Sequence, residues 1–321
     1  MIVITGAAGF IGSYMAGKLN QEGFNDLVLV DKFNDPLKIS NYISKTYNTL
    51  VDRDVFFEWL NDNHPFVQCI VHMGARTDTI GQEPEIYKQL NLDYSKRIWN
   101  SCIEYGLPLV YASSASTYGD GQFGFDDDHS LTNKYKPLNL YAQSKHDFDV
   151  WALAQEKKPY FWAGLKFFNV FGPNEYHKGR MASVVFQAFN RISDTGKMTL
   201  FRSHHPNFND GEQARDFIYV EDVANVMLHF MKTRRHSGIY NVGTGVARTY
   251  LDLAKSVFNA MNVKPDISFV DTPEDIRGNY QYYTCATINK LRQAGYDKPF
   301  TSLEDAVKDY VQSYLVAEYC Y

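Results

Sequence analysis

The chain has 321 residues, a net charge of −5, 45% hydrophobic and 15% aromatic residues. This much apolar surface excludes a disordered chain, and the length is enough for about two domains. The slightly acidic balance, without basic runs, argues against nucleic acid as a partner. No apolar stretch reaches the roughly 18 residues that a membrane span needs.

The amino terminus enters an apolar strand pattern at once, with no basic and apolar leader ahead of it. We therefore expect a soluble, cytoplasmic protein with no membrane partner. The four cysteines are scattered and lack the spacing of a disulfide framework or a zinc site, so no metal is predicted.

Short apolar runs alternate with helical patterns through the first half of the chain. The runs that are typical of buried strands lie at 2–5, 27–31, 69–72, 107–112 and 162–167. Apolar positions recur at three and four residues, as in helices, at 11–22, 52–61, 85–105 and 140–156. The connections are too long for hairpins, so this order predicts an α/β fold, a Rossmann-type doubly wound parallel sheet.

The rhythm becomes irregular after about residue 168. Helical patterns recur at 181–195, 249–261 and 302–318, and the stretch 216–241 again resembles sheet-forming sequence. We expect a dinucleotide-binding Rossmann domain built from 1–167 plus about 216–241. A smaller C-terminal α/β substrate domain would take about 168–215 plus 242–321.

A glycine-rich turn follows the first strand directly and opens a helix. Gly6, Gly9 and Gly12, with Phe10 and Ile11 between them, form this turn. Glycine lets the backbone approach a phosphate closely, and the helix N-terminus attracts the negative charge. The pattern therefore predicts a dinucleotide site at this turn.

The residue that reads the ribose is expected at the end of the next strand. Asp31 lies 19 residues past Gly12, where a carboxylate accepts hydrogen bonds from ribose hydroxyls. Asp31 alone favours NAD, because a 2′-phosphate beside a carboxylate is repelled. Lys32 and Lys38 follow closely and could neutralise such a phosphate, so the residues leave both cofactors open.

A tyrosine and a lysine stand four residues apart at the start of a predicted helix. Tyr141 and Lys145 therefore share one helix face. A tyrosine that removes a proton at neutral pH needs a stabilised phenolate, and Lys145 together with an oxidised nicotinamide would lower the pKa of Tyr141. Ser114 leaves the carboxyl end of a strand, where its hydroxyl can hold an alcohol or ketone oxygen.

The order of these features resembles the extended short-chain dehydrogenase/reductase superfamily over the first half of the chain. The segments 72–75, 169–173 and 215–220 fit the same superfamily, whose members commonly act on nucleotide sugars. The segments 177–184, 277–281 and 294–300 narrow the resemblance to the ADP-L-glycero-D-manno-heptose 6-epimerase family, over essentially the whole chain.

This resemblance implies interconversion of ADP-D-glycero-D-manno-heptose and ADP-L-glycero-D-manno-heptose through a transient 6″-ketone, for the supply of lipopolysaccharide core heptose. It implies one tightly bound NADP per subunit, with NAD as the alternative, and a homo-oligomer, a pentamer in the family. The hydroxyl proton leaves from opposite sides in the two epimers, so a second acid/base group is expected. The family assigns this role to Lys178, whose pKa would be lowered by burial near Lys145 and the nicotinamide.

The resemblance also assigns further binding residues. Besides the glycine turn, Asp31, Lys32, Lys38, Tyr141, Lys145 and Lys178, the cofactor would contact Gly74, Ala75, Asn91 and Val170. The substrate would contact Ser114, Asn169, Arg180, Gln187, Phe201, His204, Arg215 and Tyr280. The family usually has serine at position 180 and histidine at 187, and the stretch 204–213 is longer here than usual.

Two alternative functions remain open from the residues. A UDP-hexose 4-epimerase would share the Tyr-Lys-Ser set, although it has no evident use for Lys178. A sugar dehydratase has an acidic pair directly after the serine or threonine at this strand end, but Ala115 and Ser116 occupy those two positions in this chain. A catalytically retired NAD(P)-binding sensor or scaffold would be expected to have lost Tyr141, Lys145 or Ser114, and all three are present.

Overall fold

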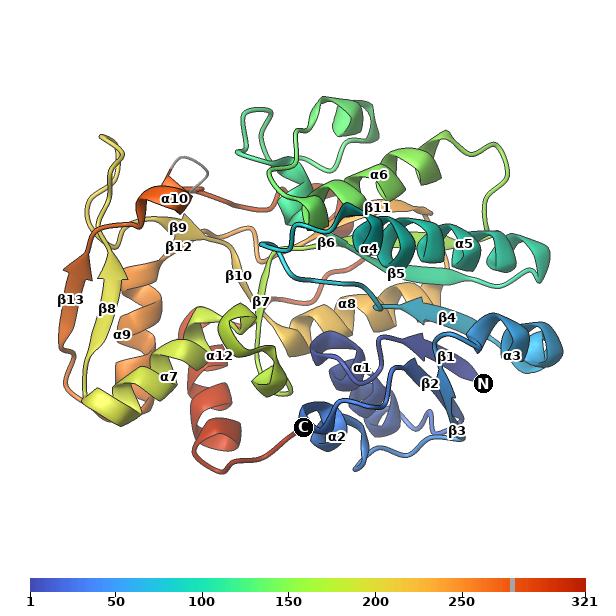
Figure 1. The fold of residues 1–321 in the computed structure, drawn as a ribbon, viewed down its shortest axis with the longest axis horizontal. Helices are drawn as coiled ribbons and strands as arrows, with labels where there is room; N and C mark the ends of the chain where they lie inside the picture. The colour runs from blue at the N-terminus through green and yellow to red at the C-terminus, as the bar shows by residue number, and fades with distance from the viewer. Residues whose placement is uncertain (278–280) are drawn as a thin grey trace.

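A seven-stranded sheet with the order β11-β6-β5-β4-β1-β2-β3 forms the centre of the molecule (Figure 1). The computed structural model describes residues 1–277 and 281–321. All pairs of neighbouring strands in this sheet are parallel. Its strands are β1 (Ile2–Thr5), β2 (Leu27–Asp31), β3 (Thr49–Asp52), β4 (Cys69–His72), β5 (Leu109–Ser114), β6 (Trp162–Phe167) and β11 (Gly238–Val242). The predicted Rossmann-type α/β fold is confirmed.

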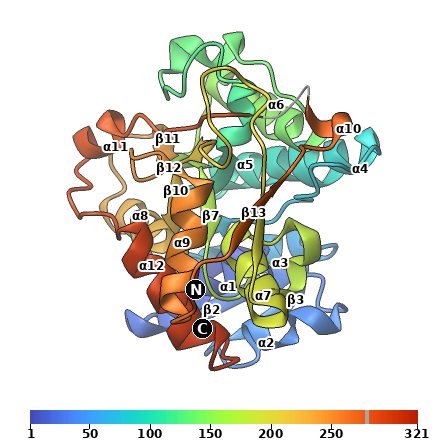
Figure 2. The ribbon, with the colours of Figure 1, turned by 90° about the vertical axis from the view of Figure 1, so that its left-hand side faces the viewer.

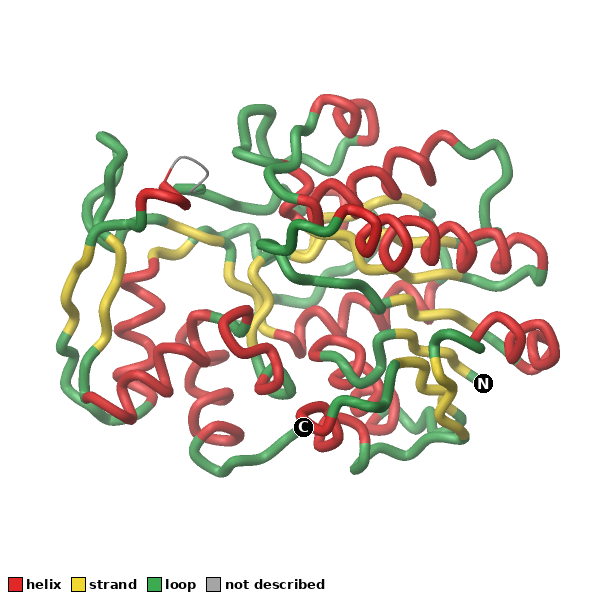
Figure 3. Tube along the Cα trace, in the orientation of Figure 1, coloured by secondary structure: helices red, strands yellow, loops and turns green. Residues whose placement is uncertain are grey.

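Helices cover both faces of this sheet (Figure 3). Side chains alternate between the faces along a strand, so Ile2 and Ile4 of β1 join one apolar core while Val3 joins another. The first core includes α1 (Phe10–Gln21) and α8 (Val220–Thr233). The second core includes α3 (Phe56–Asn63), α5 (Tyr94–Glu104) and α6 (Leu140–Ala154). Both faces are thus buried, which explains the near-continuous apolar strands.

Most predicted elements of the first half are present, with three differences. The predicted helix 85–105 is interrupted: α4 (Pro84–Tyr87) and α5 flank a π-helical segment, Lys88–Asp93. The edge strand β3 was not predicted, because it is short, only partly buried and directly followed by a helical pattern. The predicted strand 107–112 is observed as Leu109–Ser114, which places Ser114 at the strand end.

Small sheets and helices make up the rest of the fold. The remaining strands pair as β7 (Asn169–Phe171) with β10 (Phe217–Tyr219), β9 (Ala214–Arg215) with β12 (Arg248–Thr249), and β8 (Met198–Phe201) with β13 (Ile267–Val270). The remaining helices are α2 (Ile39–Tyr42), α7 (Val184–Thr195), α9 (Tyr250–Ala260), α10 (Glu274–Arg277), α11 (Asn289–Gln293) and α12 (Leu303–Asp309). α9 and α12 pack against each other in front of the sheet in Figure 2.

Within 216–241, the two ends of the stretch have different positions. β10 pairs with β7 outside the main sheet, whereas β11 joins the main sheet beside β6. The division of the chain into two domains stays a prediction. Over the ranges that the structure describes, no helix is both long and apolar enough to cross a bilayer.

Candidate active site

A cavity of about 530 Å³ opens at the carboxyl ends of the central strands. Ligands bind at this edge in open parallel sheets, because the loops that follow the strands meet there. The residues predicted for the site that line the cavity are Gly6, Gly9, Phe10, Ile11, Gly12, Asp31, Lys38, Gly74, Ala75, Ser114, Tyr141, Lys145, Asn169, Val170 and Lys178. Segments from residue 6 to residue 178 are thus brought to one place.

The glycine turn forms a cradle that any larger residue would fill. A Cβ on Gly12 would lie 2.2 Å from the carbonyl oxygen of Gly6, and Gly6 itself has a φ of +68°. Gly9 caps α1 without a side-chain hydrogen bond to the helix. Backbone N–H groups at this helix N-terminus are therefore available to an anion, which fits the pyrophosphate of a dinucleotide.

Asp31 is held rigidly at the end of β2. Its Oδ2 accepts a hydrogen bond from the backbone N–H of Ala8 at 2.9 Å, and its Oδ1 accepts from that of Lys32 at 2.8 Å. Lys38 and Arg53 line the same cavity. The Nε of Arg53 is buried and lies 3.5 Å from Asp54 Oδ1, with which it forms an ion pair. Two cationic side chains beside Asp31 fit a further phosphate group.

The side chain of Lys32 takes a different direction from that of Lys38. Its Nζ lies 3.2 Å from Asp52 and donates a hydrogen bond to Asp54. Lys32 is therefore neutralised by carboxylates at the edge of the sheet and does not line the cavity. The sequence predicts both Lys32 and Lys38 near the cofactor's ribose, but of the two only Lys38 lines the cavity.

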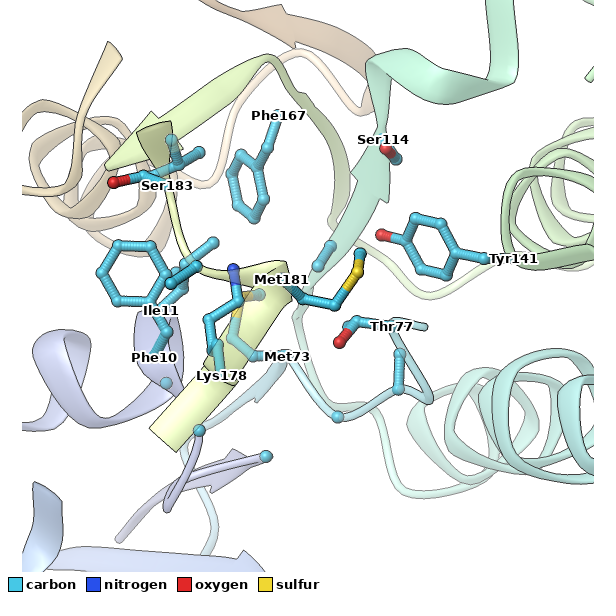
Figure 4. Close-up of a pocket in the computed structure, with 18 of the residues that line it drawn as sticks. Phe10, Ile11, Met73, Thr77, Ser114, Tyr141, Phe167, Lys178, Met181 and Ser183 are labelled. Carbon is cyan, nitrogen blue, oxygen red and sulfur yellow. The ribbon is translucent and has the colours of Figure 1, made fainter. Parts of the chain in front are cut away.

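Tyr141 and Lys145 project from the first turns of α6. The helix begins after Asn139, whose Oδ1 accepts a hydrogen bond from the N–H of Ala142 at 2.9 Å. Figure 4 shows the Tyr141 hydroxyl directed into the cavity, with Ser114 on the neighbouring strand end. A phenol and a serine hydroxyl thus face the same space, where they can hold one oxygen atom of a ligand.

The lowered pKa that the sequence predicts for Tyr141 depends on Lys145 together with an oxidised nicotinamide, and it stays a prediction. Burial of the phenol raises this pKa, and a hydrogen bond with Ser114 lowers it only in part. The charge of Asp149 raises the pKa of Tyr141 further, and the Nζ of Lys145 donates to the carbonyl oxygen of Ala112 at 2.8 Å. Burial also lowers the pKa of Lys145 to about 8.

Lys178 enters the cavity from the wall opposite Tyr141 (Figure 4). It belongs to a 3-10 turn, Tyr176–Met181, and its Nζ lies 5.2 Å from the centre of the Phe10 ring. Burial lowers the pKa of Lys178, and the charge of Glu175 opposes this change. The lowered pKa and its cause, burial, agree with the sequence prediction, and Lys145 is not among the groups that shift it in the protein.

Asn91, Gln187 and Arg180 do not line the cavity, and Arg180 is exposed. The side-chain amide of Asn91 donates to Arg76 O and Ser144 Oγ, both at 2.9 Å, and accepts from Arg76 N at 2.7 Å. Asn91 is fully buried and supports the loop after β4. Gln187 lies in α7, and its amide donates to two backbone oxygens just before that helix, Arg180 O at 3.0 Å and that of residue 182 at 2.8 Å.

A second group of predicted substrate residues lies near β8 and β9, outside the cavity lining. Arg215 is buried and donates to Ala214 O at 2.9 Å and to Gln281 O. Phe201 ends β8, and the backbone N–H of His204 donates to a tyrosine hydroxyl at 3.2 Å. Tyr280 lies outside the described residues.

The sequence did not single out several residues that line the cavity. Thr77 and Thr79 follow the segment 72–75, and Met181 and Ser183 follow Lys178. Thr77 and Thr79 lie just after a recognised motif, and Met181 and Ser183 lie within the segment 177–184, so their positions could have identified them. Arg53 directly follows β3, so it could be found only by predicting that edge strand.

Comparison with known proteins gives consistent matches over the whole chain. Residues 2–243 match the model of the NAD dependent epimerase/dehydratase family. A protein of Fusobacterium nucleatum named ADP-L-glycero-D-manno-heptose-6-epimerase is 44% identical, with 100% of both chains covered. A protein of Nitratidesulfovibrio vulgaris with the same name is 46% identical over 99% of this chain and 98% of the relative. The crystal structure of the Helicobacter pylori protein of that name is 27% identical, with a TM-score of 0.80 and coverage of 97% of this chain and 95% of that one.

Proposed function

This chain belongs to the NAD dependent epimerase/dehydratase family and, within it, to the ADP-L-glycero-D-manno-heptose-6-epimerases, and we propose that Tyr141 and Lys178 are its two acid/base groups. It is an isomerase of ADP-heptose, and the comparisons favour neither a UDP-hexose 4-epimerase nor a retired sensor. The observation that carries our proposal is the position of Tyr141 and Lys178 on opposite walls of one cavity (Figure 4).

Inversion at C6″ requires proton transfer on both faces of the reacting carbon. The hydroxyl points to opposite sides in the two epimers, so one fixed base reaches only one of them. In our proposal Tyr141 handles the hydroxyl of one epimer and Lys178 that of the other. Ser114 holds the oxygen between them, and the cavity walls, including Phe167 and Met181, exclude water. The ketone can then present either face to the same hydride donor.

A nicotinamide cofactor, when bound, supplies the reversible hydride transfer at C6″. We propose that the glycine turn holds its pyrophosphate and that Asp31 accepts hydrogen bonds from its adenosine ribose. We propose NADP rather than NAD, because Lys38 and Arg53 line the cavity beside Asp31. Two cations in this position offset the repulsion between the carboxylate and a 2′-phosphate.

The central test is to follow the stereochemistry at C6″ of ADP-heptose by NMR, with no oxidant added. We expect inversion by the wild-type protein and at least roughly a hundredfold slower inversion by Tyr141→Phe and by Lys178→Met, because each removes an acid/base group. Tyr160→Phe and Lys157→Met, at exposed positions, are the matched controls. Equal rates from both epimers without Lys178 would contradict the two-group site.

The cofactor is tested by mass analysis of the nucleotide that denatured protein releases. We expect NADP, and we expect Lys38→Ala and Arg53→Ala to shift the bound nucleotide toward NAD. Lys32→Ala is the control, because Lys32 pairs with carboxylates outside the cavity. Release of NAD from the wild type would refute the assignment.

We extend the proposal to assembly and cellular role. Its family suggests a homo-oligomer, for which light scattering of the purified protein gives the number of subunits. We also propose a cytoplasmic location and a role in supplying heptose for lipopolysaccharide. Loss of heptose from the lipopolysaccharide of a deletion strain, restored by the wild-type chain, would test that role.

A further inference from the structure

A buried ion pair lies behind the wall that carries Tyr141. Lys166 of β6 and Asp149 of α6 approach to 2.6 Å between Nζ and Oδ2, and their side chains are only 1% and 0% exposed. Neither residue lines the cavity. Burying two charges costs several kcal/mol per ion before their attraction is counted, so the pair is not explained by stability alone.

Asp149 is saturated by donors from the neighbouring strands. Besides Lys166, its carboxylate accepts hydrogen bonds from the Tyr111 hydroxyl at 3.1 Å and the Ser113 hydroxyl at 2.6 Å, both on β5. The carboxylate is therefore drawn toward the sheet and away from its own helix.

Lys166 connects the same pair to the strand end that carries Ser114. Its Nζ donates to the Thr117 hydroxyl at 2.6 Å, and that hydroxyl donates to the carbonyl oxygen of Ser114 at 2.7 Å. The chain of contacts thus runs from α6 through β6 to the backbone of the serine in the cavity.

The spacing along α6 makes this arrangement significant for the reaction. Tyr141, Lys145 and Asp149 recur every four residues and so share one helix face. A carboxylate four residues from a lysine is positioned to form an ion pair with it. Among the described residues, however, the hydrogen bond of Lys145 Nζ goes to Ala112 O, and the ion pair of Asp149 goes to Lys166.

We propose that Lys166 is a positioning residue that withholds Asp149 from Lys145 and fixes the backbone of Ser114, so that Lys145 remains available to the phenol and the cofactor. The inference rests on the proposed roles of Tyr141, Lys145 and Ser114. In this inference the buried ion pair fixes the positions of Tyr141, Lys145 and Ser114 relative to one another.

Several other titratable groups lie around the face of α6 that carries Tyr141, Lys145 and Asp149. His72 of β4 faces Lys145, and burial lowers its pKa to about 3, so it is neutral at neutral pH. His146 neighbours Asp149 on α6, and burial and Lys166 lower its pKa. Among the described residues, the buried phenols of Tyr111 and Tyr118 also face Asp149, and burial raises their pKa values. Lys290 interacts with Lys166, and burial together with the charge of Lys166 lowers the pKa of Lys290.

The test compares pH profiles of kcat/KM for epimerisation in three variants. Lys166→Met leaves the negative charge of Asp149 near Tyr141 and Lys145, so the limb due to Tyr141 should move to higher pH by roughly one unit. Asp149→Asn leaves the positive charge of Lys166 and should move the limb to lower pH. The double variant should return to the wild-type limb, and Lys166→Arg should keep both the limb and the rate within about threefold.

A purely structural pair would behave differently. It would lower the melting temperature and the rate in both single variants without moving the limb, and that result would overturn the inference. If Lys166→Met does not fold, an unmoved limb in Asp149→Asn overturns it equally. Full activity of Tyr141→Phe would remove the proposed function and this inference together, whereas an inactive Tyr141→Phe with unmoved limbs in the pair variants removes this inference alone.

Discussion

Replacement of Glu175 tests how the loop that carries Lys178 is held. Glu175 is fully buried, and its Oε2 accepts from the Ser183 N–H at 2.5 Å. Its Oε1 accepts from the Ser183 hydroxyl at 2.6 Å and from the Gly172 N–H at 3.4 Å. One carboxylate therefore joins the start of the loop, after β7, to the residue that caps α7.

Glu175→Ala should destabilise the protein and displace Lys178. The two short hydrogen bonds of Ser183 lose their acceptor, at about 1–3 kcal/mol for each unsatisfied donor. Burial raises the pKa of Glu175, so removing its charge recovers part of this cost. We expect a net loss of about 3 kcal/mol, which is roughly 5 °C in melting temperature for a chain of this size.

Glu175→Gln separates the charge from the hydrogen bonds. The amide oxygen still accepts from Ser183, but the negative charge that opposes the lowered pKa of Lys178 is lost. The limb of the pH profile that reports Lys178 should therefore move to lower pH. The folded-state pKa of Glu175 lies above its ordinary value of 4.5. The contribution of this group to the stability of the wild type therefore falls as the pH rises from 4.5 toward the folded-state pKa. The Gln variant should lack this fall.

Scanning calorimetry and the pH dependence of epimerisation check both variants, with Glu156→Ala and Glu156→Gln at an exposed position as controls. The reasoning would be refuted if Glu175→Ala melted within one degree of the wild type and Glu175→Gln left the Lys178 limb in place, within about 0.2 pH units.

Three further predictions concern the cradle and the core. Gly12→Ala puts a Cβ 2.2 Å from Gly6 O, so we expect at least roughly tenfold less nucleotide in the purified protein, measured after denaturation. The folded-state pKa of His72, about 3, lies below its ordinary 6.5, so its contribution to stability is complete above pH 6.5 and is lost as pH falls. In His72→Gln, the free energy of unfolding in urea should therefore change less with pH between about 3 and 6.5 than in the wild type. Tyr118→Phe removes a buried hydrogen bond of 2.6 Å to Asn241 and should cost about 1–2 kcal/mol in urea unfolding, and an unchanged midpoint would contradict this.

Much of the cavity could be predicted from the sequence because its residues follow strand ends. The glycine turn, Asp31, Ser114 and the Tyr141–Lys145 pair stand in local patterns, and parallel strands bring their carboxyl ends to one edge. The direction of a long side chain has no such local signal. Lys32 follows Asp31 directly, yet its ammonium binds the carboxylates at the edge of the sheet.

Local periodicity thus determined the α/β fold and the order of the elements, short motifs indicated the glycine turn, Asp31 and the Tyr141–Lys145 pair, and the family resemblance added Lys178. Tertiary structure decided what surrounds each group. It placed Lys178 across the cavity from Tyr141 and buried the phenol of Tyr141, which raises its pKa. It also paired Asp149 with Lys166 rather than with Lys145, which is nearer in the sequence. Burial and charge at a side chain depend on segments that are far apart in the sequence, and only the packed fold brings those segments together.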